Sequence, residues 1–167
     1  MKKIKMLVMD VDGTMTDGKI YQGENGELLK AFFARDGYGI KNILPTLNII
    51  PAVITGLDTK IVASRMADLD VKEVHQGIPS GKVDKLKEIS KKYNIQLDEM
   101  LYIGDDVNDM DCMEVVGFCA CPPDSHPTVL AFMKNRKNAY ITEAAAGYGA
   151  VREVIDLIKR KLIEISI

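Results

Sequence analysis

The sequence lacks several features that define specialised classes of protein. Three cysteines among 167 residues are too few, and odd in number, for a framework of internal disulfides. We therefore expect a reducing, cytoplasmic setting. No apolar run approaches the roughly 20 residues needed to cross a bilayer. The first apolar run reaches acidic residues too soon to be the core of a signal peptide.

The sequence also lacks an excess of charge and has few histidines. A formal net charge of −2 gives no electrostatic case for nucleic acid or a membrane, so we expect neither as a partner. His75 and His126 are the only histidines and lie far apart, so each is expected to be structural. A composition of 47% hydrophobic and 28% charged residues is ordinary for a globular protein. The length predicts a single domain over residues 1–167.

The most informative stretch is an apolar run, Lys5 to Met9, that leads directly into Asp10 and Asp12. The run has the length of a buried strand. Alternate residues of a strand share a face, so the two carboxylates point the same way just past its end. Gly13 then lets the chain turn sharply. An isolated Asp-x-Asp-Gly is equally well explained as a turn, so the rest of the chain has to decide between a turn and a site.

The remaining chain predicts strands that alternate with helices. A hairpin is expected over Lys19–Tyr21 and Leu28–Phe33, and Arg35–Gly39 is either a plain loop or a substrate contact. Further strands are expected over 48–55, 71–75, 100–103, 117–121 and 139–142, with helices near 40–47, 61–69, 82–93, 109–113, 128–133 and 150–163. This alternation predicts an α/β, Rossmann-like, three-layer fold. It has a central parallel sheet and a short hairpin flap after the first strand, but no insertion long enough for a cap domain.

Polar residues follow several of these strands or begin a helix. They form four clusters: Asp10/Asp12, Thr55/Gly56, Lys82, and Asp105/Asp106/Asp109. In a doubly wound sheet they converge on one edge, where the carboxylates repel one another unless a cation intervenes. Ligands that are all oxygen favour Mg²⁺ before Ca²⁺ and do not suit zinc. Thr55 and Lys82 can then hold phosphate oxygens, which leaves one carboxylate to attack phosphorus and one to move a proton.

These clusters resemble, in order, the four motifs of the haloacid dehalogenase-like phosphatases. The resemblance covers essentially the whole chain and rests on Asp10–Thr14, Thr55-Gly56, Lys82 and Gly104–Asp109. Lys85 also lies near the third motif, but Lys82 is preferred because it begins the helix nearer the strand edge.

The resemblance implies a role for each site residue. Asp10 is the nucleophile, and Asp12 protonates the leaving alcohol and then activates water. Mg²⁺ is held by the carboxylates of Asp10 and Asp105 and by the main-chain carbonyl of Asp12. The phosphate group is bound by Thr55, Gly56 and Lys82, with Asp106 and Asp109 in supporting positions.

A narrower resemblance is to the capless, tetrameric branch that contains the 3-deoxy-D-manno-octulosonate 8-phosphate phosphatases. It rests on Asp12–Gly18, Phe33–Ile40, Arg65–Leu69 and Gly147–Glu153. It implies a sugar-acid phosphate as substrate, a homotetramer, and a place in lipopolysaccharide biosynthesis. The sequence departs from that branch at Leu57, at Ile78–Gly81 and at Ala146.

Several interpretations stay open from the sequence. Arg65 and Arg152 are candidate substrate contacts, although a surface ion pair is the expected role of Arg152. Cys119 and Cys121 share a strand face and are expected to be buried as small apolar residues. Two other functions combine similar residues: a phosphoacceptor signalling domain and a non-catalytic oligomerisation module. Asp12 favours a hydrolase over the first, and the intact motifs argue against the second.

Overall fold

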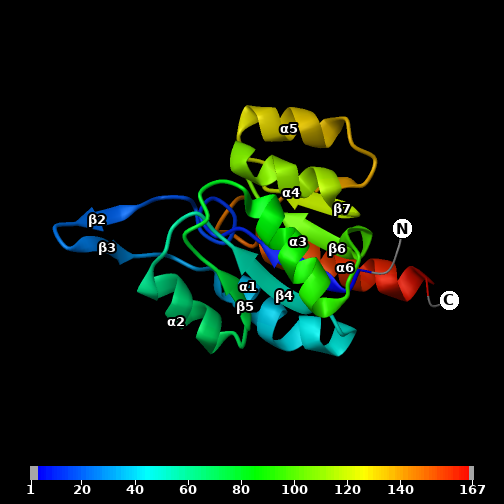
Figure 1. Cartoon of the computed structure of the whole chain (residues 1–167), viewed down its shortest axis with the longest axis horizontal. Helices are drawn as coiled ribbons and strands as arrows, with labels where there is room; N and C mark the ends of the chain where they lie inside the picture. Colours follow the sequence, from blue (N-terminus) through cyan, green and yellow to red (C-terminus); the bar gives the residue numbers. More distant parts are fainter. Residues whose placement is uncertain (1–3, 166–167) are drawn as a thin grey trace.

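The computed structural model describes residues 4–165, and among these it leaves aside the side chains of 27, 28 and 162–165. Figure 1 shows a central sheet between helices, with a hairpin that projects from one end. The sheet contains β1 (Met6–Met9), β4 (Ile50–Ile54), β5 (Glu73–His75), β6 (Met100–Ile103), β7 (Phe118–Cys121) and β8 (Ala139–Ile141). The hairpin contains β2 (Tyr21–Gly23) and β3 (Gly26–Leu29).

The helices lie between these strands, as the alternating pattern predicts. They are α1 (Ala34–Tyr38), α2 (Lys60–Asp68), α3 (Lys82–Tyr93), α4 (Met110–Val115), α5 (Pro127–Lys134) and α6 (Ala150–Ile165). Four tighter or wider helical turns complete the order: η1 (Gly39–Ile43), η2 (Leu44–Leu47), η3 (Leu97–Glu99) and η4 (Val107–Asp109).

All six strands of the main sheet are parallel, in the order β5-β4-β1-β6-β7-β8. Strands β4 and β5 therefore lie on one side of β1, and the later strands β6, β7 and β8 lie on its other side. Met9, the last residue of β1, lies between Val53 of β4 and Ile103 of β6. Ligands of open α/β sheets bind beyond the strand ends at such a reversal of order. The fold thus places the candidate site at the carboxyl end of β1.

Strand β1 is buried on both faces, which explains its continuous apolar sequence. Leu7 and Met9 face the core formed with α2, η1 and α6, whereas Met6 and Val8 face the core formed with α3, α4 and α5. Helices therefore cover both faces of the sheet, and the expected three-layer α/β fold is confirmed. Among the described residues, no inserted cap domain interrupts these elements.

Two segments differ from expectation. The hairpin forms, but β2 lies at Tyr21–Gly23 instead of Lys19–Tyr21, and β3 begins at Gly26 and ends at Leu29 instead of continuing to Phe33. The glycine-rich stretch Arg35–Gly39 is helical, so its interpretation as a loop is wrong. A Cβ on Gly37 would lie 2.4 Å from Nη2 of Arg65, and one on Gly39 would lie 2.9 Å from Cδ1 of Ile155. Because these two glycines have no side chain, α2 and α6 can pack closely against the helical segment that contains them.

Candidate active site

The polar residues predicted from the sequence lie at three neighbouring strand ends and one helix start. Asp10 follows β1, Thr55 follows β4, Asp105 comes after β6, and Lys82 is the first residue of α3. A cavity of about 280 Å³ opens beside Asp10, Thr55 and Lys82, and Asp105 lies outside its lining. Its lining includes Asp10, Asp12, Thr55, Gly56, Lys82 and Asp106, with Ile20, Leu57, Pro79 and Asn108 at the remaining positions.

Lys82 joins two carboxylates inside this site. Its Nζ donates to Oδ1 of Asp10 at 2.8 Å and to Oδ1 of Asp109 at 2.7 Å. All three side chains are buried. Burial lowers the pKa of Lys82, but the two carboxylates raise it more strongly, so the net pKa lies above its usual value. Lys82 is therefore a fixed positive charge next to Asp10, and Lys85 instead pairs with Glu88 on the helix surface.

Asp109 is fully occupied as a hydrogen-bond acceptor. Its Oδ1 also accepts from the hydroxyl of Tyr102 at 2.7 Å, and its Oδ2 accepts from the backbone N–H groups of Asp105 and Asp106. Gly104 makes room for it, since a Cβ there would lie 2.4 Å from the Asp109 Cγ. Asp109 thus holds both Lys82 and the loop after β6 in place.

The carboxylates of Asp10, Asp105 and Asp109 form a compact acidic cluster. One oxygen of each lies within 4.8 Å of the others. Burial, followed by repulsion from Asp109, raises the pKa of Asp105 to about 7 and that of Asp10 well above its usual value. Such mutual repulsion is what a bound cation relieves. Since hydrogen bonds already occupy both oxygens of Asp109, Asp10 and Asp105 are the better placed to ligate a metal.

The loop that follows β1 allows Asp105 to lie close to Gly13 and Thr14. Gly13 has φ +85°, and a Cβ on it would lie 2.1 Å from Oδ2 of Asp105. Thr14 donates from Oγ1 to Oδ1 of Asp105 at 3.0 Å. The site needs glycine at position 13 both for the backbone angle and for this close approach.

Thr55 lines the cavity and carries a hydroxyl group without a hydrogen-bond partner among the described residues. The residue and its Oγ1 are buried. A buried hydroxyl without a partner is costly, so this atom is suited to donate to a ligand oxygen. The cavity also includes Asp106, whose Oδ1 accepts from the N–H of Val107 and caps η4.

Two residues of this region are not predicted from the sequence. The buried side chain of Lys30, which follows β3, donates from Nζ to Oδ1 of Asp12. Tyr102 lies in the otherwise apolar strand β6 and binds Asp109. A hydroxyl within an apolar strand next to the acidic loop was a signal for Tyr102. The sequence gives no comparable signal for Lys30, because its ion pair with Asp12 depends on the path of the chain after the hairpin.

Several weighed residues lie outside the cavity lining. Arg152 binds both carboxylate oxygens of Asp156, and Arg65 stacks over the ring of Phe32. His75 contacts Glu73, and the ring of His126 accepts from the N–H of Thr128 at the start of α5. The three cysteines are buried and unpaired, as expected.

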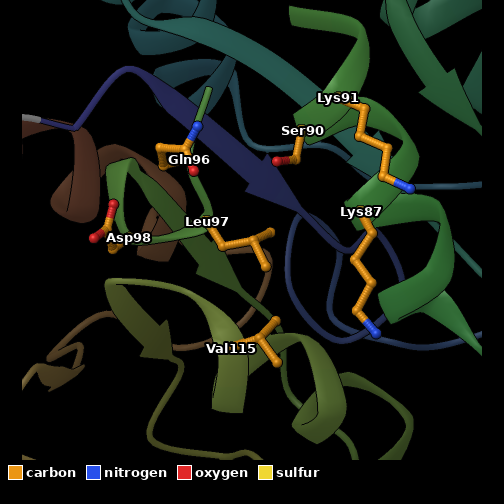
Figure 2. Close-up of a pocket in the computed structure, with 7 residues that line it drawn as sticks. All are labelled: Lys87, Ser90, Lys91, Gln96, Leu97, Asp98 and Val115. Carbon is orange, nitrogen blue, oxygen red and sulfur yellow. The ribbon is translucent and has the colours of Figure 1, made fainter. Parts of the chain in front are cut away.

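A larger hollow of about 450 Å³ lies elsewhere on the molecule. Figure 2 shows Lys87 and Lys91 of α3 on one side of it and Leu97 and Asp98 on the other. It brings together no cluster of carboxylates. Volume alone therefore does not identify the site of chemistry.

Comparisons with known proteins agree with this geometry. The family model for haloacid dehalogenase-like hydrolases matches residues 74–151. The 3-deoxy-D-manno-octulosonate 8-phosphate phosphatase of Salmonella typhi is 43% identical over 157 residues, which cover 94% of this chain and 80% of that protein.

Two solved structures are similar over almost the whole chain. The 3-deoxy-D-manno-octulosonate 8-phosphate phosphatase of Yersinia pestis has a TM-score of 0.85 at 42% identity, with 93% of this chain and 80% of that chain covered. The enzyme of the same name from Moraxella catarrhalis has a TM-score of 0.84 at 35% identity, with 94% and 86% covered. It was solved in complex with a magnesium ion, a phosphate ion and a KDO molecule.

The fold, the acidic cluster and these relatives define a hydrolase of the haloacid dehalogenase-like superfamily. Within that superfamily, the chain belongs to the family of the 3-deoxy-D-manno-octulosonate 8-phosphate phosphatases. It is accordingly a phosphoric monoester hydrolase. No helix among residues 4–165 is long and apolar enough to span a membrane.

Proposed function

We propose that this enzyme is a Mg²⁺-dependent phosphatase that hydrolyses a sugar-acid phosphate through an aspartyl-phosphate on Asp10. The observation that carries the proposal is the contact of Asp10 with the buried ammonium of Lys82, beside a cavity that is also lined by Thr55, whose Oγ1 has no partner among the described residues. This arrangement pairs a carboxylate nucleophile with donors for the phosphate oxygens.

Each step follows from the position of these side chains. Thr55 Oγ1, the N–H of Gly56 and Lys82 bind the phosphate oxygens, and a carboxylate oxygen of Asp10 attacks phosphorus. As the P–O bond to the alcohol breaks, Asp12 gives the leaving oxygen a proton. Asp12 then takes a proton from the water that attacks phosphorus, which releases inorganic phosphate and restores Asp10.

The metal is held in this proposal by the carboxylates of Asp10 and Asp105 and by the main-chain carbonyl of Asp12. When bound, Mg²⁺ neutralises charge on the carboxylates and on the phosphate oxygens. The all-oxygen donor set suits Mg²⁺. The magnesium ion in the Moraxella catarrhalis relative supports this choice of metal.

The substrate proposed first is 3-deoxy-D-manno-octulosonate 8-phosphate, with related eight- or nine-carbon keto-acid phosphates next. The names of the relatives support this order, as well as a place in lipopolysaccharide biosynthesis. At the cavity rim, Leu57 is 41% exposed and supplies an apolar surface instead of a charge. The relatives give no support to a phosphoacceptor signalling domain or a non-catalytic oligomerisation module.

A panel of phosphate esters tests the proposal. The purified enzyme with Mg²⁺ should release phosphate from 3-deoxy-D-manno-octulosonate 8-phosphate with a higher kcat/KM than from p-nitrophenyl phosphate. Nine-carbon keto-acid 9-phosphates and simple hexose phosphates complete the panel, and the Asp10→Asn variant controls for contaminating phosphatases. Turnover of p-nitrophenyl phosphate without turnover of any keto-acid phosphate would contradict the proposed substrate class.

We further propose a homotetramer in which the hairpin region, roughly Lys19 to Phe33, packs between subunits and closes a neighbouring site. Ile20, Tyr21 and Leu29 are 54%, 40% and 49% exposed within the single chain, which is a large apolar surface for so short a segment. Ile20 also lines the cavity. A neighbour that covered this region would exclude water from the reaction.

The size of the particle and a shortened hairpin test this assembly. Sedimentation should give a tetramer, and deleting 23–27 should impair turnover of the large sugar-acid phosphate more than that of p-nitrophenyl phosphate. A monomer with full activity on the sugar-acid phosphate would contradict it. The three unpaired thiols support a reducing, cytoplasmic location, which we also propose.

A further inference from the structure

Lys30 is a buried cation at the point where the hairpin rejoins the body of the protein. Its side chain is fully buried, and its Nζ donates to Oδ1 of Asp12. Lysine is almost never fully buried unless it is paired, because removing an ammonium from water is costly. A buried charge next to a carboxylate of the cavity therefore indicates a role for Lys30 beyond packing.

Only one member of this ion pair, Asp12, belongs to the cavity lining. Asp12 lines the cavity and its side chain is 21% exposed, whereas Lys30 is not among the lining residues. Lys30 thus contacts Asp12 from the protein side. Since Lys30 binds Oδ1, the orientation of the carboxylate is fixed and Oδ2 is the oxygen left to reach the leaving group.

We propose that Lys30 is a positioning residue that holds the Asp12 carboxylate in the orientation needed to protonate the leaving oxygen. This inference rests on the proposed function. When the P–O bond breaks, the proton of Asp12 passes to the departing alkoxide, and the bond from Asp10 to phosphorus forms on the opposite side. Proton transfer needs a donor within hydrogen-bond reach, so a carboxylate free to rotate loses much of its effect. Lys30 also ties the placement of Asp12 to the hairpin.

The dependence on the leaving group separates positioning from a merely structural ion pair. The phenolate of p-nitrophenyl phosphate leaves with little protonation, whereas an alkoxide needs a proton. We therefore compare kcat/KM for p-nitrophenyl phosphate with kcat/KM for two alkyl phosphates, 3-deoxy-D-manno-octulosonate 8-phosphate and glycerol 3-phosphate. The alkyl phosphate that the wild type hydrolyses faster is used for the ratio.

Lys30→Met should lower kcat/KM for the alkyl phosphate about 100-fold and that for p-nitrophenyl phosphate less than about tenfold. Lys30→Arg, which restores a cation, should recover most of the loss. Lys5→Met is the matched control, because Lys5 pairs with Glu99 at the other end of β1 and lies outside the cavity lining. It should change neither value. Lys30→Gln provides the same comparison if the Met variant does not fold.

Equal losses on both substrates, or no loss on either, would overturn the role of Lys30. A double-mutant cycle adds a second criterion. In an Asp12→Asn chain, Lys30→Met should change kcat/KM for p-nitrophenyl phosphate less than about twofold, and a full independent loss would also overturn it. A wild type that hydrolyses no phosphate ester would instead overturn the proposed function, so the two failures are distinguishable.

Discussion

Asp36 provides a quantitative test of the electrostatics that this fold imposes. The carboxylate is 2% exposed, and its Oδ1 accepts from the N–H of Arg152 in the first turn of α6 at 2.7 Å. Its Oδ2 is buried without a hydrogen-bond partner among the described residues. Burial raises the pKa of Asp36 from 3.8 to about 6, against the opposing attraction of Arg152 and Arg65.

A raised pKa means that the folded chain binds the Asp36 proton more tightly than the unfolded chain does. The stabilisation is therefore complete below pH 3.8 and is lost as the pH rises through about 6. Each pKa unit corresponds to about 1.4 kcal/mol, so the free energy of unfolding should fall by about 3 kcal/mol over this range.

Asp36→Asn should remove this pH dependence, because an amide keeps an oxygen acceptor for Arg152 and carries no charge. Urea denaturation of both proteins from pH 4 to 8, in EDTA, measures the difference between their free energies of unfolding. Groups that titrate alike in both proteins cancel in that difference. From pH 4 to 8, the free energy of unfolding of the wild type should fall relative to that of the variant by about 2–3 kcal/mol, mostly between pH 4 and 6. A difference that stays constant with pH would contradict the raised pKa of Asp36.

Three further predictions concern the site. Activity should require Mg²⁺ and fall with excess Ca²⁺, which prefers more ligands at longer distances and would misplace Asp10; full activity in EDTA, or undiminished turnover with Ca²⁺ alone, would contradict this. Tyr102→Phe removes one hydrogen bond to Asp109 and should cost about 1 kcal/mol of stability by urea denaturation; an unchanged midpoint argues against that bond. Gly104→Ala places a Cβ 2.4 Å from the Asp109 Cγ and should reduce kcat, whereas wild-type kcat would show that Asp109 need not stay in place.

The sequence was informative where chemistry follows strand ends. Asp10, Thr55 and Asp105 each come shortly after an apolar run, and parallel strands bring such positions together at one edge. The α/β fold could be predicted for the same reason, because strands and helices alternate in the sequence. That residues 1–167 form a single domain stays a prediction.

Features that depend on distant contacts could not be predicted from the sequence. Gly37 and Gly39 lie in a helix although glycine disfavours helices, and the reason is the approach of Arg65 and Ile155 from other helices. The pairing of Lys30 with Asp12 likewise depends on the path of the hairpin. The saturation of Asp109 by four hydrogen bonds appears only when β6, α3 and the acidic loop are placed together.

The central claim is that Asp10 carries the phosphate group during turnover. Rapid acid quenching of the enzyme with substrate and Mg²⁺, followed by mass spectrometry of its peptides, tests this most directly. The peptide that contains Asp10 should carry one phosphate group, which forms before free phosphate appears and is absent from the Asp10→Asn variant. Steady turnover with no phosphorylated peptide at any quench time, or with the phosphate group on another residue, would contradict the account.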